Sequence, residues 1–426
     1  MVGSKSTSTS RGVPLLKVLL AVLPASPVQL AAQSALHPPL ADSGVTGNSV
    51  MLCTRVLWND NPIAVIAGRT ADWFKADQPG DTDRTGASHP KLHVLPRGLA
   101  KTGDASIGQA MVNPATWTAR YGSVVVVARG RYVFDGMNEK GLAAHALALS
   151  SDYGARDPSL KGVHTSLLVP YILDHAATVE EAIALISHLQ PVSVIVDGFA
   201  MDLSLTIEDR SGNSAVIEWP TAIPPAPPST APTADPPRDD KFVPVRVTIG
   251  KFRAFVYQGR HVRVMANEDL AASHLQQKAN WPYAVDTATR STVIPGNAWR
   301  SFRWARAAFF SDFLSRMKRR TVLEARAALM SVMRIVSNPI GAPGDQGGPN
   351  DRGDETDWRT LSDLTNLEYI FDNPRTLATF GTDLKRLDFQ SGAGVRVLDP
   401  GDPSLHGDVT GLYRPTSTPV PGIMGR

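Results

Sequence analysis

The chain has 426 residues, of which 42% are hydrophobic, and its 43 basic and 40 acidic side chains give a formal net charge of +3. This composition is typical of a folded globular protein and excludes a disordered chain. The basic residues are interspersed with acidic ones, so we expect no nucleic-acid partner. The only cysteine, Cys53, excludes an intrachain disulfide and a multi-cysteine metal site. Its thiol is therefore either an inert core group or a nucleophile.

The N-terminus has the pattern of an export signal. Basic residues precede an apolar run at 18–32, and Ala32 to Ser34 place small residues where a signal peptidase cleaves. This pattern predicts a signal peptide over residues 1–34 and an exported protein, periplasmic or secreted. The alternative is a disordered N-terminal tail. The run is too short, and too interrupted by proline, to span a bilayer as a helix, so no stable membrane insertion is expected.

Alternating and apolar segments predict a series of strands. Residues 54–58, the turn residues 59–61 and residues 62–68 predict a β-hairpin that opens at Cys53. Residues 123–134 are predicted as one buried strand, and residues 135–149 as a turn followed by another strand. Further strands are expected at 202–209 and 214–219, which form a second hairpin, and at 263–268, 367–373 and 376–384.

Two helices have clear start signals. Thr178 with Glu181, and Thr321 with Glu324, each form a capping box ahead of an apolar stripe. Strands and helices follow one another without a regular βαβ repeat, which favours an α+β layered fold. A third helix is predicted from about Ser301 to Met317, with Phe302, Ala305, Phe309 and Phe313 facing inward.

Two segments have the composition of surface insertions. A Pro-rich stretch at about residues 220–240 lies between predicted strands, and a Gly/Asp-rich stretch at about 341–357 is predicted as a loop. Neither has the character of a linker between domains. We therefore expect a single domain over residues 53–426.

Motifs spread over the strands carry the chemistry. They are Cys-Thr-Arg at 53–55, Gly-Arg-Thr-Ala-Asp-Trp at 68–73, Asp-Gly-Met-Asn-Glu-Lys-Gly-Leu at 135–142, Met-Ala-Asn-Glu at 265–268, and Arg303. In this order they resemble the choloylglycine hydrolase family, which comprises penicillin V acylases, bile salt hydrolases and related linear-amide hydrolases. The resemblance extends from Cys53 to about Asp388. It implies an N-terminal-nucleophile hydrolase with a four-layer αββα sandwich of antiparallel sheets.

The resemblance also implies why there is one cysteine at this place. In such enzymes the leader is removed so that the cysteine becomes the first residue, which here predicts a propeptide over residues 35–52. The free α-amine of Cys53, with an ordinary pKa near 8, then serves as the general base beside the thiol. By the same resemblance, Asp72 holds that amine over the sulfur and the charge of Arg69 favours the thiolate.

The remaining site residues follow from the same motifs. Asn267 matches the oxyanion-hole asparagine and Arg303 the second arginine of the site, which orders Cys53 and Asp72. Ala148 stands where the family has tyrosine or asparagine. It keeps the backbone N–H that serves as an oxyanion donor but lacks the pocket-shaping side chain. We expect Trp73 to line the acyl pocket or pack in the core, and His145 to be a core histidine or a substrate contact.

Taken singly, these residues have ordinary explanations. A lone cysteine at the start of a strand is more often buried packing than a nucleophile, and Asp72 or Asn267 could cap a turn or a strand end. The motif context reverses that preference for Cys53. The sequence therefore predicts a hydrolase of small amphipathic N-acyl amides, such as penicillin V, an N-acyl homoserine lactone or a conjugated bile salt.

No metal or organic cofactor is expected for that chemistry, and family resemblance implies a homo-oligomer, a tetramer. The alternative is an exported, non-catalytic protein on the same fold that binds a small ligand, with Ala148 marking the decay of the site. Retention of Cys53, Arg69, Asp72 and the other motif residues favours the hydrolase.

Overall fold

The computed structural model describes the chain from residue 51 to residue 424 with several gaps. The described residues are 51–74, 90–106, 110–196, 199–221, 245–249, 252–268, 300–316, 321–342 and 354–424, together with Gly3, Gly296 and Ala298. Those from residue 51 onward belong to one compact unit, Gly47–Arg426. Apart from Gly3, the predicted signal peptide, the propeptide up to residue 50 and residues 222–240 of the Pro-rich stretch lie outside the described residues.

The first of two large sheets contains Cys53. Its seven strands run in the order β17-β1-β2-β18-β19-β20-β22, and neighbours are antiparallel except for the parallel pair β20–β22. The predicted hairpin is its β1–β2 pair, although β1 begins two residues before Cys53. The strands are β1 (Met51–Trp58), β2 (Ile66–Phe74), β17 (Val264–Met265), β18 (Asp354–Asp363), β19 (Glu368–Asn373), β20 (Ala378–Asp383) and β22 (Gly407–Asp408).

The second large sheet has ten antiparallel strands in the order β15-β16-β14-β13-β8-β7-β6-β3-β21-β23. The predicted hairpin at 202–219 is its β13–β14 pair. The strands are β3 (Lys91–Leu95), β6 (Ser123–Ala128), β7 (Tyr132–Asn138), β8 (Ala143–Ala148), β13 (Leu203–Glu208), β14 (Ser214–Glu218), β15 (Val245–Ile249), β16 (Phe252–Gln258), β21 (Arg396–Leu398) and β23 (Arg414–Pro415).

Short elements complete the described fold. β4 (Ala100–Thr102) pairs with β5 (Thr116–Thr118), β9 (Lys161–His164) runs parallel to β10 (Leu189–Val192), and β11 (Ile195–Val196) pairs with β12 (Phe199–Ala200). Three 3₁₀ turns are η1 (Thr165–Leu167), η2 (Leu384–Arg386) and η3 (Thr410–Leu412).

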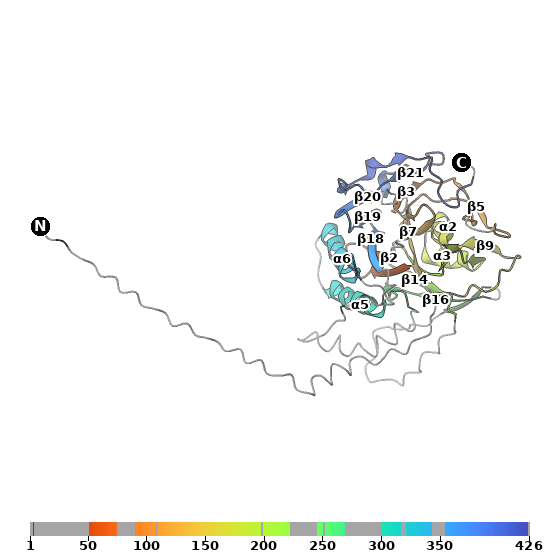
Figure 1. The fold of residues 1–426 in the computed structure, drawn as a ribbon, viewed down its shortest axis with the longest axis horizontal. Helices are drawn as coiled ribbons and strands as arrows, with labels where there is room; N and C mark the ends of the chain where they lie inside the picture. The colour runs from red at the N-terminus through yellow and green to blue at the C-terminus, as the bar shows by residue number, and fades with distance from the viewer. Residues whose placement is uncertain are drawn as a thin grey trace, which may run out of the picture. The chain divides into compact units, whose positions relative to one another are not determined.

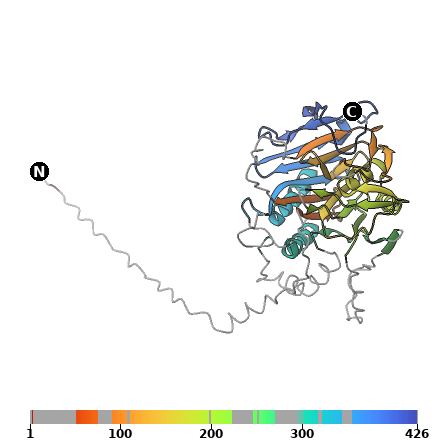
Figure 2. The same ribbon diagram turned by 45° about the vertical axis from the view of Figure 1, so that its right-hand side comes forward.

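Helices cover the outer face of each sheet, which makes four layers. α5 (Arg300–Arg316) and α6 (Val322–Val336) pack on β1, β2 and β18, while α2 (Leu168–His175) and α3 (Val179–Ile186) pack on β7, β8 and β13. Figures 1 and 2 show the strands of both sheets between these helix pairs. The predicted αββα sandwich of mainly antiparallel sheets is confirmed. None of the helices described is long and apolar enough to cross a membrane.

Both predicted capping residues begin their helices. The side chain of Thr178 accepts a hydrogen bond from the Glu181 N–H at the start of α3, and Thr321 accepts one from the Glu324 N–H at the start of α6. Each cap satisfies a backbone donor that the first turn of a helix leaves open. The local sequence therefore determines where these two helices begin.

The prediction of one strand over residues 123–134 is wrong. The segment forms two strands, β6 and β7, joined by a tight turn in which Arg129 has φ 49° and Gly130 has φ 62°. Two successive residues with positive φ are the geometry of a hairpin turn, and Gly130 adopts it without steric cost. Both faces of β6 are covered, so all of its residues are buried and no alternation marks its end.

The inward face predicted for the third helix is also wrong. The buried side chains of α5 are Arg303, Trp304, Ala307, Ala308 and Leu314, among others, whereas Phe313 is 36% exposed. The aromatic residues instead contact one another along the outer side, with Phe309 and Phe313 ring centroids 4.9 Å apart. The spacing of the phenylalanines predicted the wrong face of the helix. The face of α5 that packs on β1 contains the buried Arg303 instead.

The Gly/Asp-rich stretch is not a loop throughout. Residues 343–353 lie outside the described part of the chain, but residues 354–357 form the first part of β18 and pair with β2. Acidic residues are disfavoured in strands, so the composition predicted a loop. Pairing with the strand after Cys53 overrides that preference and brings Thr356 opposite Asp72.

Candidate active site

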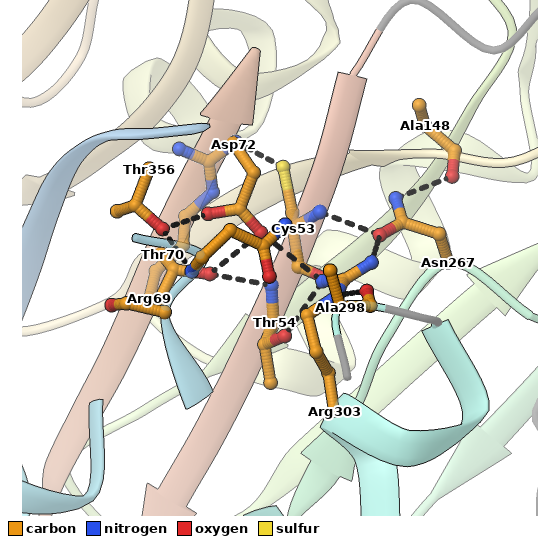
Figure 3. A network of polar contacts seen from close by, with 12 residues as sticks. Cys53, Thr54, Arg69, Thr70, Asp72, Ala148, Asn267, Ala298, Arg303 and Thr356 are labelled. Carbon is orange, nitrogen blue, oxygen red and sulfur yellow. Dashed lines mark hydrogen bonds and ion pairs between the residues drawn. The ribbon is translucent and has the colours of Figure 1, made fainter. Parts of the chain in front are cut away.

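The Cys53 sulfur lies in the interior between the two sheets. Arg69, from β2, donates a hydrogen bond from Nη2 to the sulfur at 3.2 Å, and the same nitrogen donates to the Ala146 carbonyl of β8 at 2.9 Å (Figure 3). Cys53 and Arg69 are both fully buried. A guanidinium group that bonds to both sheets thus holds a fixed positive charge against the thiol.

Burial and charge act in opposite directions on this thiol. Burial raises the pKa of Cys53 above its ordinary value, and the negative charge of Asp72 adds to that rise. The positive charges of Arg69 and Arg303 and a hydrogen bond from the Asp72 backbone lower the pKa. Because a thiolate is the reactive form of cysteine, these cations are the groups that make the buried sulfur usable as a nucleophile.

Asp72 lies on β2 beside the cysteine and accepts hydrogen bonds on both carboxylate oxygens. Thr356 donates to Oδ1 at 2.5 Å, and Arg303 donates to Oδ2 at 3.2 Å. Burial raises the pKa of Asp72 to about 6, while Arg303 and the Thr356 hydroxyl oppose that rise. A carboxyl with this pKa is mostly ionised near neutral pH and can accept a hydrogen bond from an amine.

Asn267 links the backbone of Cys53 to Ala148. Its side-chain oxygen accepts hydrogen bonds from the Cys53 N–H at 2.5 Å and from Arg303 Nη2 at 2.9 Å. Its side-chain nitrogen donates to the Ala148 carbonyl at 2.8 Å, at the last residue of β8. Figure 3 shows Asn267 and Asp72 on opposite sides of Cys53. The two residues predicted to form the oxyanion hole therefore lie next to each other.

Arg303 reaches into this group from α5. Its Nη1 donates to the Cys53 carbonyl and to the Thr54 hydroxyl, each at 2.9 Å, in addition to Asp72. Its Nε donates to the Ala298 carbonyl at 3.1 Å. One fully buried guanidinium thus contacts the nucleophile residue, the carboxylate and the asparagine at once.

Three threonines of the site were missed from the sequence. Thr54 binds Arg303, Thr70 accepts a hydrogen bond from the Thr54 N–H at 3.0 Å, and Thr356 binds Asp72. Strand alternation could have found Thr70, because a residue two positions from Asp72 points to the same face of β2. Nothing local marks Thr356, whose partner is 284 positions away.

His145 does not lie where a substrate could reach its ring nitrogens. Its Nδ1 is 2.7 Å from Asp135 Oδ1 and its Nε2 is 2.6 Å from Glu208 Oε1, and all three residues are fully buried. Both ring nitrogens are occupied, so the structure does not support a substrate contact through them. Trp73 lies on β2 opposite Met51 and Glu355, and its side chain lies outside the described part of the structure.

Comparison with known proteins gives this arrangement its context. The family model described as linear amide C–N hydrolases, choloylglycine hydrolase family, matches residues 53–221, a range that begins at Cys53. A penicillin V acylase of Pectobacterium atrosepticum is 28% identical over 395 residues, which cover 87% of this chain and 92% of that protein. Over residues 53–221 the chain therefore matches the choloylglycine hydrolase family. It is accordingly an enzyme, a linear amide C–N hydrolase.

Solved structures agree with that assignment. The penicillin V acylase of Agrobacterium tumefaciens superposes with a TM-score of 0.66 at 26% identity, covering 88% of this chain and all of that one. A mutant conjugated bile acid hydrolase of Clostridium perfringens, 15% identical, has a TM-score of 0.59 and covers 81% of this chain and 96% of its own. At that identity the second likeness shows the shared fold alone.

Proposed function

We propose that this protein is a penicillin V acylase-like hydrolase whose nucleophile is Cys53, freed as the first residue of the mature chain. The observation that carries the proposal is that three side chains form hydrogen bonds with Cys53. Arg69 bonds to its sulfur, Asn267 to its backbone N–H and Arg303 to its carbonyl. All four residues are almost completely buried.

Maturation requires the Leu52–Cys53 peptide bond to break. In the uncleaved chain the nitrogen of this bond donates to Asn267 at 2.5 Å, so the bond is already held within the site. The Cys53 thiol attacks the Leu52 carbonyl carbon, its proton passes to the peptide nitrogen, and a thioester and a free amine result. Water then hydrolyses the thioester, which releases the leader and restores the thiol. Cleavage by a separate protease would give the same mature chain.

Acyl transfer then uses the new amine. The α-amine accepts the thiol proton while the sulfur attacks the amide carbon of the substrate, and Arg69 stabilises the thiolate. The Asn267 side-chain N–H and the Ala148 backbone N–H stabilise the negative oxygen of the tetrahedral intermediate. One such donor contributes about 3 kcal/mol to the transition state.

The same amine completes the cycle. Its proton passes to the nitrogen of the leaving amine, which departs and leaves the acyl group on the sulfur as a thioester. The amine next removes a proton from water, which attacks the thioester carbon. The carboxylic acid is released and the thiol is restored. Asp72 accepts a hydrogen bond from the amine and keeps it beside the sulfur throughout.

The proposed substrates are small amphipathic N-acyl amides. Two of the relatives are penicillin V acylases by name, which supports an acyl amide as the reacting group. Ala148 lacks the side chain that a tyrosine or asparagine would place near Asn267, so we expect this position to accept a bulkier acyl chain. Penicillin V, N-acyl homoserine lactones and conjugated bile salts are the compounds to test.

Export and assembly belong to the proposal as well. The N-terminal pattern supports a signal peptide over 1–34 and a periplasmic or secreted enzyme, with residues 35–52 removed before Cys53. Resemblance to the family supports a tetramer. Light scattering of the mature protein tests the oligomer, and fractionation of expressing cells tests the location.

The decisive experiment determines the N-terminus and the activity of one preparation. Protein from export-competent expression is analysed by intact mass and N-terminal sequencing, and then assayed with penicillin V. We expect a chain that begins Cys-Thr-Arg-Val and releases 6-aminopenicillanic acid. A chain that begins upstream of Cys53 and still hydrolyses penicillin V would refute the free amine as base. Equal activity of the Cys53→Ser variant would refute the thiol as nucleophile.

A further inference from the structure

Arg69 has a second set of contacts, behind the nucleophile. Its Nη1 lies 3.6 Å from Asp135 Oδ2 of β7, and its guanidinium carbon is 5.8 Å from the centre of the Trp358 ring. Among the described residues, neither its Nε nor its Nη1 has a hydrogen-bond partner. This buried cation therefore lies between the Cys53 sulfur, which Nη2 contacts together with the Ala146 carbonyl, and the Asp135 carboxylate, which Nη1 faces.

Asp135 belongs to a buried row of alternating charges. Its other oxygen contacts His145 Nδ1 at 2.7 Å, and His145 Nε2 contacts Glu208 at 2.6 Å. Glu208 in turn forms an ion pair with Arg55 at 2.6 Å. An imidazole can donate to two carboxylates only when both nitrogens carry protons, so this geometry requires a cationic His145. Together these groups connect the two sheets across the core.

We propose that Asp135, His145 and Glu208 are positioning residues that set how strongly the Arg69 cation stabilises the Cys53 thiolate. This inference rests on the proposed role of Cys53 as nucleophile. Asp135 draws the guanidinium away from the sulfur, and His145 limits that pull by neutralising Asp135. Glu208 keeps His145 charged. The row acts on the sulfur only through Arg69, so none of its members touches the substrate.

The signs of these charges predict in which direction each substitution changes the thiolate fraction of Cys53. Loss of the Asp135 charge leaves the Arg69 cation to the sulfur alone and favours the thiolate. Loss of the His145 charge leaves the negative charge of Asp135 without a neutralising neighbour on that side. Asp135 then attracts Arg69 more strongly, which disfavours the thiolate. In the His145 variant, Asp135 still faces Arg69 and Glu208 still pairs with Arg55, so both carboxylates stay ionised. The two substitutions are therefore expected to change the thiolate fraction in opposite directions.

The other charged groups near this path are few. Arg69 and Asp72 from β2 and Arg303 from α5 act on the Cys53 thiol. Arg69 is also influenced by Tyr369 from β19, whose pKa lies well above its usual range because of burial. None of these groups is altered in the variants below, so they contribute equally to every titration.

The test uses the single cysteine of the chain. The ultraviolet absorbance of the thiolate is titrated against pH in the full chain as purified, with Cys53→Ser subtracted, for Asp135→Asn and His145→Gln. Lys101→Met is the control, because it breaks another buried ion pair, 2.8 Å to Asp174, that does not contact the site. The pH profile of kcat/KM with penicillin V is recorded in parallel.

We expect the thiolate fraction at a fixed pH to rise about threefold in Asp135→Asn and to fall about threefold in His145→Gln. Lys101→Met should leave the thiolate fraction of Cys53 unchanged. Shifts in the same direction, or shifts no larger than that of the control, would overturn the proposal. If His145→Gln does not fold, Glu208→Gln replaces it. Without Glu208, His145 loses its proton more readily, so this variant should also lower the thiolate fraction, and a rise would overturn the proposal.

The titration is independent of the proposed function. A protein that hydrolyses no amide would refute the penicillin V acylase-like assignment, yet its thiolate titration would still decide whether the row acts on Arg69. Conversely, an active enzyme with unchanged titrations would refute the row and leave the proposed function standing.

Discussion

Two buried polar clusters of this enzyme differ in how completely their charges are matched. In the cluster around Asp174 of α2, Oδ1 accepts a hydrogen bond from Lys101 Nζ at 2.9 Å, and Oδ2 lies 2.8 Å from the same ammonium and accepts from Trp117 Nε1 at 2.7 Å. Around the Cys53 sulfur, Arg69 and Arg303 act on the thiol beside Asp72, and Arg69 faces Asp135 only at 3.6 Å, with no hydrogen-bond partner for its Nε or Nη1 among the described residues.

The difference separates a structural cluster from a reactive one. One ammonium and one carboxylate at Asp174 satisfy each other, so nothing further is needed to balance the charge. The donors of Arg69 near Cys53 are only loosely matched by Asp135, so they favour the negative charge that forms when the sulfur becomes a thiolate or a substrate oxygen becomes negative. A buried site with unmatched donors costs stability but favours the charges that form during the reaction.

The largest expected effect is the loss of turnover in Cys53→Ser. We expect kcat/KM with penicillin V to fall roughly a thousandfold or more, because a hydroxyl does not ionise beside Arg69 as a thiol does. Thermal unfolding should change little, since the two side chains have similar volume. If maturation is autocatalytic, intact mass will also show residues 35–52 still attached. Turnover equal to that of the unaltered enzyme would remove the distinction between the two clusters.

Asp174→Asn should have the opposite profile, with a large effect on stability and little on catalysis. The substitution leaves Lys101 charged and unpaired in the core, so urea unfolding should show a loss of about 3–5 kcal/mol. The kcat/KM of the folded fraction should stay within about twofold of the unaltered value. A large catalytic defect in well-folded protein would show that this cluster also serves the site.

Asn267→Ala is expected to lower kcat roughly a hundredfold with little change in KM, because the lost donor acts mainly on the transition state. Stability should fall by about 1–3 kcal/mol, because the Cys53 N–H and Arg303 Nη2 lose the acceptor that they share. Steady-state kinetics and urea unfolding measure the two effects. A rise in KM alone would assign Asn267 to substrate binding rather than to the oxyanion hole.

Thr356→Val tests the carboxylate of the site. Without the Thr356 hydroxyl, the pKa of Asp72 should rise further above about 6, since this hydrogen bond opposes the effect of burial. Activity should fall about fivefold near pH 6 and less near pH 8, where Asp72 stays ionised. Thr379→Val is the matched control, because Thr379 donates to a different carboxylate of the same sheet, Asp372. A pH-independent loss would contradict the role of Asp72.

The last prediction concerns stability at alkaline pH, away from the chemistry of the site. Two carboxylates raise the pKa of His145 from 6.5 to about 9 in the folded protein, although burial opposes them. The folded state therefore binds this proton more tightly than the unfolded state does. The resulting stability is fully present below about pH 6.5 and is lost as the pH rises through about 9. Urea unfolding across this range should show the decline, and His145→Gln should show less of it.

Much of the local structure was predictable from short segments. Cys53 opens a hairpin because turn residues separate two apolar strands, and Thr178 and Thr321 begin helices because their side chains accept from the first turn. The motif that contains Arg69 and Asp72 predicted their neighbourhood to Cys53, since paired strands place them close to it. The order of the motifs also predicted the αββα sandwich.

Local patterns thus predicted the nucleophile candidate, the turns and caps, and the resemblance to the choloylglycine hydrolase family. The inward face of Arg303 on α5, the strand that contains Thr356, and the place of His145 between Asp135 and Glu208 became clear only from the folded chain. These contacts escaped prediction because of their distance along the chain. Periodicity and capping act within a few residues, whereas these contacts join segments that meet only after the strands pair and the two sheets stack.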